Sequence, residues 1–159
     1  MEIKRDRVND GLKVNEMEIV TWGDKYAVGI ASIDKQHREL VDLTNKLYYA
    51  CLTRNEDIDA AFKTTMSRLV EYVRFHFSDE QVLLERIKYP NYTDHKKEHD
   101  KLIRDILKAA KDHSAGKKFI PNQFVRTLKD WIFGHIAVTD KIYSAYVNEQ
   151  RKKGLLKDL

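Results

Sequence analysis

Two pairs of metal-binding side chains stand four residues apart within residues 74–99. His76 precedes Glu80 by four residues, and His95 precedes His99 by four. Residues four apart lie one above the other on one face of an α-helix, so each pair can direct two ligand atoms into one small volume. Imidazole is a ligand for Fe, Zn, Cu and Ni, and a carboxylate extends the choice toward Mn and Fe. The spacing predicts a metal site built from two helices.

The sequence KYPNY separates the two pairs. Pro90 lacks a backbone donor and disfavours helical backbone at Tyr89, so the first helix is expected to stop there. A second helix should begin near Asn91, because asparagine is favoured at the N-cap. Two helices joined by so short a turn fold back antiparallel. The two ligand pairs are therefore expected to face each other.

Four segments carry apolar residues at alternating steps of three and four, which is the pattern of a helix packed on a partner. They predict helices over residues 32–51, 58–87, 92–113 and 121–146. No segment shows a strand pattern, and the connections are short. The economical fold is all-α, an up-down-up-down antiparallel four-helix bundle.

Local signals mark the helix ends. The first helix should begin near Ser32 or Asp34, and residues 54–57 form the turn after it. Gly116 is a natural left-handed stop for the third helix, and Pro121 fits the first turn of the fourth.

We expect three parts in the chain. Residues 1–20 form a mobile N-terminal arm, residues 21–150 the bundle, and residues 151–159 a basic tail that is a frayed helix end. Within the second part, residues 22–30 are expected to be an ordered lead-in that packs across the bundle.

Composition narrows the class of protein. The formal net charge of +4 comes from Lys and Arg mixed with Asp and Glu, so no nucleic-acid partner is expected. Cys51 is the single cysteine, which excludes an internal disulfide and suits a reducing compartment, so we expect a cytoplasmic protein. No uncharged run approaches about 18 residues, and no signal peptide is visible, so no membrane span is expected.

Five of the six histidines fall on the inward stripes of the expected helices: His37, His76, His95, His99 and His135. A single histidine on an apolar face is usually a hydrogen-bonded core residue. Five imidazoles and Glu80 are harder to satisfy, because each unpaired buried polar group costs roughly 1–3 kcal/mol. A shared metal would satisfy them together. His113 lies more than three turns beyond His99 and is interpreted as non-ligating.

These residues give the chain its resemblance to the bacterial hemerythrins, a family of non-haem di-iron oxygen-binding proteins. The matching pieces are GIASIDKQHREL around His37, FHFSDEQ around His76 and Glu80, YPNYTDHKKEH around His95 and His99, and HIAVTDKIYSAY around His135 and Asp140. They extend over residues 22–146. Gln81 and Leu84 stand where an acidic residue and a methionine are expected, and neither is a ligand position.

The resemblance implies two iron ions per chain, bridged by an oxo or hydroxo group. It divides the ligands between the ions as follows: His95, His99 and His135 hold one ion, His37 and His76 hold the other, which keeps an open position, and Glu80 and Asp140 bridge both. It also implies an oxygen pocket lined by Leu40, Phe77, Trp131, Ile132 and Ile136.

Asp140 does not fit a regular helix. It follows His135 by five residues, which rotates it about 140° away, and periodicity alone would make it a surface residue. Two geometries could bring it to the metals. A wide π-turn between His135 and Asp140 would re-aim the side chain, or a regular helix could present the two residues from its opposite flanks.

The resemblance implies reversible dioxygen binding, for carriage, storage or delivery. The alternatives are oxygen or redox sensing, and a di-iron enzyme acting on peroxide or nitric oxide. An enzyme would need an acid or base near the open position, and the implied pocket lining is apolar, so we expect no enzyme activity. The expected partners are dioxygen and an unidentified reductant or oxygen-accepting protein, with the chain a monomer.

Overall fold

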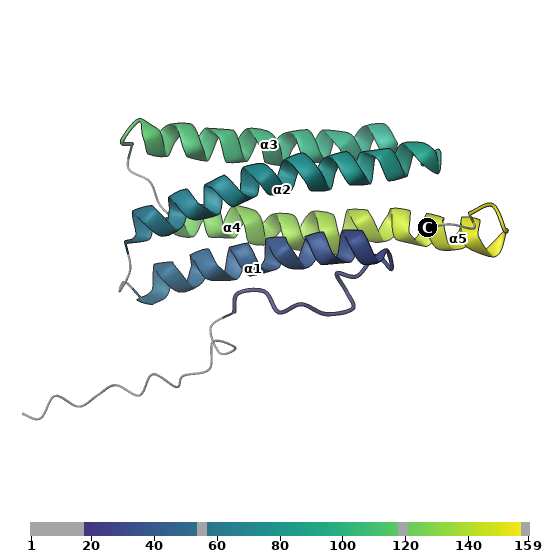
Figure 1. The fold of residues 1–159 in the computed structure, drawn as a ribbon, viewed down its shortest axis with the longest axis horizontal. Coiled ribbons are helices and arrows are strands. Elements are labelled where there is room, and N and C mark those ends of the chain that lie inside the picture. Colours follow the sequence, from purple (N-terminus) through teal and green to yellow (C-terminus); the bar gives the residue numbers. More distant parts are fainter. Residues whose placement is uncertain (1–17, 54–56, 118–120, 157–159) are drawn as a thin grey trace, which may run out of the picture.

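A computed structural model describes residues 18–53, 57–117 and 121–156 of the 159-residue chain. Four helical rods run antiparallel along one axis (Figure 1). The first three are α1 (Ala31–Thr53), α2 (Ile58–Arg86) and α3 (Tyr92–Ser114). The fourth joins three segments end to end, α4 (Pro121–Trp131), the π-helix η2 (Ile132–Thr139) and α5 (Asp140–Lys152). The predicted all-α, up-down-up-down bundle is confirmed.

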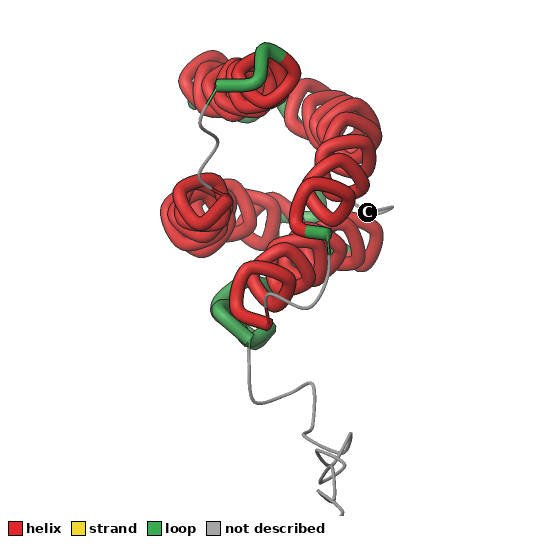
Figure 2. Tube along the Cα trace, turned by 90° about the vertical axis from the view of Figure 1, so that its left-hand side faces the viewer, coloured by secondary structure: helices red, strands yellow, loops and turns green. Residues whose placement is uncertain are grey.

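The rods surround a common axis when the bundle is seen end-on (Figure 2). Helix α1 packs against α2 and α4, and α2 packs against α3. Between α3 and the fourth rod a surface groove of about 820 Å³ remains, and its lining includes Glu98, Trp131, His135 and Thr139. One edge of the bundle is therefore less tightly closed than the others.

The core consists of two apolar clusters, with a layer of buried polar residues between them along the bundle axis. This polar layer contains His37, His76, Glu80, His95, His99, His135 and Asp140. On α2, Leu69 and Phe77 belong to one cluster and Leu83 and Leu84 to the other. On the fourth rod, Leu128 and Ile132 belong to the first cluster, and Tyr143 and Val147 to the second. Burial of these apolar side chains stabilises the bundle on both sides of the layer.

The predicted helix ends are largely confirmed. Helix α2 ends before Pro90, and Gly116 ends α3 with a left-handed φ of 64°. The described part of the fourth rod begins at Pro121. In the expected turn over residues 54–57, the first three lie outside the described residues, and Asp57 caps α2 by accepting hydrogen bonds from the backbone of Asp59 and Ala60.

The predicted start of α3 at Asn91 is confirmed, although the side chain does not cap the helix. Asn91 occupies the N-cap position of α3, but its side chain makes no capping hydrogen bond, and its backbone has φ −96° and ψ 20° rather than extended geometry. The short turn after α2 sets this conformation, since Lys88 adopts a left-handed φ of 53° two residues before Pro90. The connection, and not the asparagine, sets where α3 begins.

The lead-in to α1 is ordered and crosses the bundle, as predicted. Asp34 accepts hydrogen bonds from the backbone N–H groups of Val28 and Gly29, at 2.6 and 3.1 Å. On the other side, the Ser144 hydroxyl of α5 donates to the Val28 carbonyl at 2.7 Å. This segment therefore ties the start of the first rod to the end of the fourth.

The expected mobile arm and basic tail lie partly outside the described residues, which exclude 1–17 and 157–159. Residues 19 and 20, placed in the arm by the sequence, instead pack on α1, where the Asn45 side chain accepts hydrogen bonds from both backbone N–H groups. In the tail, α5 continues to Lys152, and Gly154 turns the chain with φ 70°.

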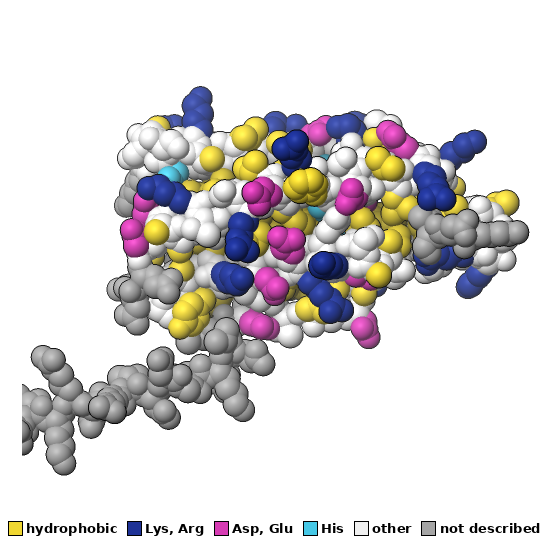
Figure 3. Space-filling view, viewed as in Figure 1, with side chains coloured by type: hydrophobic (Ala, Val, Ile, Leu, Met, Phe, Trp, Pro, Cys, Tyr) yellow, Lys and Arg dark blue, Asp and Glu magenta, His cyan; other side chains and the backbone are white. Residues whose placement is uncertain are grey.

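The surface carries mixed charge. On the face drawn in Figure 3, Lys and Arg side chains alternate with Asp and Glu over all visible helices. Among the described residues, no helix combines the length and apolar character that crossing a membrane requires.

Candidate metal centre

All seven residues that the sequence nominated as ligands meet in the polar layer. Helix α1 contributes His37, α2 contributes His76 and Glu80, α3 contributes His95 and His99, η2 contributes His135, and α5 begins with Asp140. Each of these side chains belongs to a residue that is at most 2% exposed. The layer therefore brings every rod to one buried polar site.

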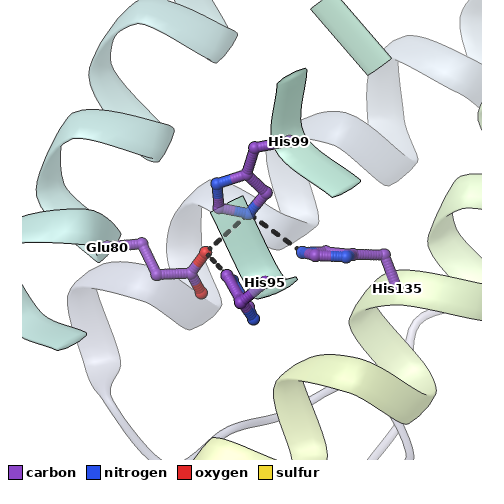
Figure 4. Close-up of side chains that lie close together, drawn as sticks. All are labelled: Glu80, His95, His99 and His135. Atoms are coloured by element: carbon purple, nitrogen blue, oxygen red, sulfur yellow. Dashed lines mark hydrogen bonds and ion pairs between the residues drawn. The ribbon is translucent and has the colours of Figure 1, made fainter. Parts of the chain in front are cut away.

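His95, His99 and His135 form one group with Glu80. We call these three histidines the three-histidine side. Figure 4 shows the four side chains turned toward one point. The Glu80 Oε2 atom lies 3.1 Å from Nε2 of His95 and 3.0 Å from Nε2 of His99. The Nε2 atoms of His99 and His135 lie 2.9 Å apart. One oxygen and three nitrogens of these four residues lie within 4.8 Å of one another, close enough to hold one cation.

His37 and His76 form the second group, the two-histidine side. Their rings lie 4.9 Å apart between centroids, and Nε2 of His76 lies 4.0 Å from Oε2 of Glu80. His37, His76 and Glu80 likewise offer ligand atoms within 4.8 Å of one another. Glu80 therefore belongs to both groups.

Asp140 lies between the two sides. Its Oδ1 atom is 3.1 Å from Nε2 of His135, and its Oδ2 atom is 3.3 Å from Nε2 of His37. The two oxygens of one carboxylate thus face opposite sides of the site. A bridging carboxylate holds two cations close together and offsets part of their mutual repulsion. The arrangement suits a pair of ions better than a single ion.

The π-turn predicted between His135 and Asp140 is confirmed. Residues Ile132–Thr139 form a π-helix, and the Asp140 N–H donates to the carbonyl of His135, five residues earlier. The extra residue in this turn makes a five-residue spacing behave like a four-residue spacing, so both side chains reach the site. The alternative of a regular helix with flanking side chains is wrong. The π-helix begins three residues before His135, earlier than the sequence indicated.

Several buried ligand atoms have no hydrogen-bond partner in the part of the chain that the structure describes. They are both ring nitrogens of His37, Nε2 of His76, Oε1 of Glu80 and both oxygens of Asp140. Leaving such atoms buried and unpaired costs about 1–3 kcal/mol each. Cations between the two sides would satisfy them, and imidazole with carboxylate is a donor set that suits iron. The residues present therefore fit a metal pair.

Comparison with known proteins agrees with this geometry. Residues 28–147 match the family described as "Hemerythrin HHE cation binding domain". The chain belongs to the hemerythrin family.

Individual relatives match this chain over most of its length. A bacteriohemerythrin of Methylococcus capsulatus is 29% identical over 128 residues, which cover 80% of this chain and 95% of the relative. One of Stenotrophomonas maltophilia is 30% identical over 131 residues, covering 82% and 83%. A crystal structure of wild-type hemerythrin superposes with a TM-score of 0.71 at 28% identity, covering 80% of this chain and 96% of that one.

Burial keeps part of this hemerythrin site neutral. It lowers the pKa of His76 to about 3, and it also lowers the pKa of His99 below its ordinary value. A neutral imidazole is the form that binds a metal, because protonation removes the lone pair. These two side chains are therefore ready to act as ligands at neutral pH.

The pKa values of Glu80 and His135 are shifted so that both groups favour their charged forms. Burial opposes the charge on Glu80, but hydrogen bonds from His95 and His99 outweigh it and hold the Glu80 pKa well below its usual range. Burial also opposes a charge on His135, yet the carboxylates of Asp140 and Glu98 outweigh it and raise the pKa of His135 to about 9. The three-histidine side therefore has one carboxylate, that of Glu98, which has no counterpart on the two-histidine side.

Two residues that support ligands were missed by the sequence analysis. The Nδ1–H of His76 donates to Oε1 of Gln36 at 2.9 Å, and the Nδ1–H of His135 donates to Oε2 of Glu98 at 2.6 Å. Each partner immediately precedes a ligand, Gln36 before His37 and Glu98 before His99. A neighbour in sequence points about 100° away around the helix, so it faces the adjacent rod. Its position beside a ligand was the available signal.

The residues expected to line the pocket lie around the site. Leu40, Phe77, Ile132 and Ile136 are buried, whereas Trp131 is only partly buried, at the groove between α3 and the fourth rod. The Phe77 ring stacks on His99 at 3.8 Å between centroids, and the Trp131 ring stacks on His135 at 4.0 Å. Both aromatic rings thus cover the three-histidine side.

His113 is far from this arrangement. Its ring packs against Phe62 with 4.7 Å between centroids, and its Nε2 atom pairs with Asp59 near the start of α2. The structure therefore agrees with the interpretation of His113 as a non-ligand.

Proposed function

We propose that this hemerythrin-family protein binds dioxygen reversibly at two iron ions held by the seven residues of the polar layer. The main support is the position of Asp140. Its two carboxylate oxygens face opposite sides of the site, 3.1 Å from Nε2 of His135 and 3.3 Å from Nε2 of His37. Family membership supports the choice of iron and of dioxygen. The bound iron pair would supply both electrons and an open coordination position.

We propose the same division of ligands that the family resemblance implied. His95, His99 and His135 would complete one ion, and His37 and His76 would hold the other, with Glu80 and Asp140 shared. The side with two imidazoles has fewer protein ligands, so the open position belongs there. An oxo or hydroxo bridge from solvent would complete the pair.

The chain's own contribution to reversible binding is enclosure. Leu40, Ile132 and Ile136 are each 0% exposed and belong to the apolar cluster that adjoins the layer. They would keep water away from the bound oxygen, and a dry pocket slows irreversible oxidation. The same side chains also pack the core, and the two roles are compatible.

Tyr72, near the two-histidine side, is an exception to the predicted apolar lining of the oxygen pocket. Tyr72 is buried, its ring stacks on His76 at 4.9 Å between centroids, and its hydroxyl makes no hydrogen bond within the described segments. Burial raises the Tyr72 pKa well above its ordinary value. The phenol therefore keeps its proton and can act as a hydrogen-bond donor beside His76.

Iron analysis and rapid mixing test the proposal. The purified protein should hold two irons per chain, and the reduced form mixed with oxygen should give a new absorption spectrum that reverses under argon. Glu80→Ala should lose iron from both sides, whereas Glu71→Ala, which removes an exposed carboxylate from the same helix, should retain it. A single iron per chain, or oxidation without a reversible spectrum, would contradict the proposal.

The proposed cellular role rests on the same chemistry. Reversible binding serves carriage, storage or delivery of oxygen, with an unidentified reductant or oxygen-accepting protein as partner. Rapid turnover of peroxide or nitric oxide by the iron-loaded protein would favour the enzyme alternative instead.

A further inference from the structure

Glu98 makes a contact that the ligand set does not explain. It stands on α3 directly before His99, and its side chain is 46% exposed in the groove between α3 and the fourth rod. Its Oε2 atom accepts a hydrogen bond from Nδ1 of His135 at 2.6 Å. A bond this short between a carboxylate and an imidazole is charge-assisted, and such bonds are roughly twice as strong as neutral ones.

The same carboxylate also contacts the end of the π-helix. The Thr139 hydroxyl donates to Oε2 of Glu98 at 3.1 Å, and lies 3.4 Å from Oε1. His135 and Thr139 are both residues of η2, and Asp140 follows directly. Glu98 therefore ties the wide turn to α3 at two points, next to the residue whose re-aimed side chain links both sides of the site.

No other ligand imidazole has such a partner within the described residues. Nδ1 of His76 faces the neutral amide of Gln36 at 2.9 Å. Nδ1 of His37, His95 and His99 makes no hydrogen bond. Among the described residues, the single carboxylate that accepts from Nδ1 of a ligand histidine thus lies on the three-histidine side, where it acts on His135 alone.

An acceptor at Nδ1 has two effects on a ligand histidine. It fixes the tautomer with the proton on Nδ1, so that the Nε2 lone pair points to the metal, and a charged acceptor makes Nε2 more basic. A more basic ligand favours the ferric over the ferrous ion. An amide acceptor, like that on His76, fixes the tautomer without adding charge.

We propose that Glu98 is a positioning residue that orients His135 and lowers the reduction potential of the iron on the three-histidine side. This inference rests on the iron site of the proposed function. It assigns different electronic roles to the two irons, with the carboxylate-supported ion more easily oxidised and the amide-supported ion left with the open position.

The exposure of Glu98 makes the proposal testable without unfolding the bundle. Glu98→Gln keeps the shape and an acceptor oxygen but removes the charge. Spectroelectrochemistry should show a reduction potential that is higher by about 59 mV. For one electron, this shift is about a tenfold change in the oxidation equilibrium at one iron. Competition with a chelator should show iron affinity reduced by about 10- to 100-fold, the usual effect of losing a partner of a ligand histidine.

Matched variants separate charge from shape. Asp105→Asn removes another carboxylate of the same groove, one that pairs with Lys101 at 3.2 Å, and should leave the potential unchanged. Thr139→Val keeps the bond between Glu98 and His135 and should also leave the potential near that of the wild type. Gln36→Glu places a charge on the His76 side and should lower the potential.

The outcomes are distinguishable. If the wild-type protein holds two irons and Glu98→Gln changes neither potential nor iron affinity, the role of Glu98 is overturned and the proposed function stands. If Glu98→Ala changes the potential but Glu98→Gln does not, only shape matters and the electronic role is overturned. A wild-type protein that binds no iron overturns the proposed function, and this inference with it.

Discussion

The two sides of the site differ in what supports their imidazoles. On the three-histidine side, His135 bonds to the carboxylate of Glu98 and borders an open groove. On the two-histidine side, His76 bonds to the amide of Gln36 and lies under the ring of Tyr72. One side has a charged carboxylate partner beside an open groove, and the other has a neutral amide partner beneath an aromatic ring. In the proposed di-iron site, the two ions would therefore have similar ligands but different surroundings.

Removing a ligand of the two-histidine side tests the difference between the two sides most directly. We expect His37→Ala to impair oxygen binding more than it lowers the thermal stability of the apoprotein, because neither ring nitrogen of His37 has a hydrogen-bond partner in the described chain. Oxygen titration and thermal unfolding measure the two effects. His113→Ala, which alters a histidine outside the layer, is the matched control. Reversible oxygen binding with an unchanged spectrum in His37→Ala would show that His37 is not a ligand.

A second change weakens the cover of the other side. Trp131→Ala removes the ring stacked on His135, and should lower the free energy of unfolding by about 3 kcal/mol, the low end for such changes, because the ring is only partly buried. Water should then reach the metals from the groove, so the oxygenated form should decay faster to the ferric form. Trp22→Ala, which removes a ring packed on Tyr26, should leave the decay unchanged. An unaltered decay in folded Trp131→Ala would remove it from the pocket.

The charges on the two sides should appear in the pH dependence of apoprotein stability. The folded pKa of His76 is lowered to about 3, so its contribution is present above the unfolded value of 6.5 and is lost as the pH falls toward 3. The folded pKa of His135 is raised to about 9, so its contribution is present below 6.5 and is lost as the pH rises to 9. Thermal unfolding of chelated protein should show decreasing stability on both sides of about pH 6.5. A profile that is flat through both windows would contradict this assignment.

The smallest expected effect concerns the π-helix that joins the two sides. A Cβ atom added at Gly134 would meet no atom within 4 Å, so Gly134→Ala should be accommodated. It should raise the free energy of unfolding by about 0.5–1 kcal/mol, because alanine loses less conformational freedom than glycine within a helix. Denaturant unfolding and iron analysis of the variant test this. Loss of iron would instead show that the wide turn needs the flexibility of glycine.

Much of the fold was predictable because its signals are local. The stripe of apolar residues, the turn at Pro90 and the left-handed stop at Gly116 each depend on a few neighbouring residues. The π-turn was also predictable, once the resemblance had nominated Asp140, because a five-residue spacing conflicts with a regular helix. Asn91 occupies the predicted N-cap position, but its side chain makes no capping hydrogen bond, because the tight connection sets the backbone there.

Helical periodicity in the sequence is enough to place five histidines on the buried stripes: His37, His76, His95, His99 and His135. The packing of the rods sets which of them share a carboxylate oxygen and which have Glu98 or Gln36 at Nδ1. The tertiary structure also decided that Trp131 borders a groove, because the spacing between two rods depends on their packing. Contacts within one helix follow from residue spacing, whereas contacts between helices depend on how the rods are placed around the axis.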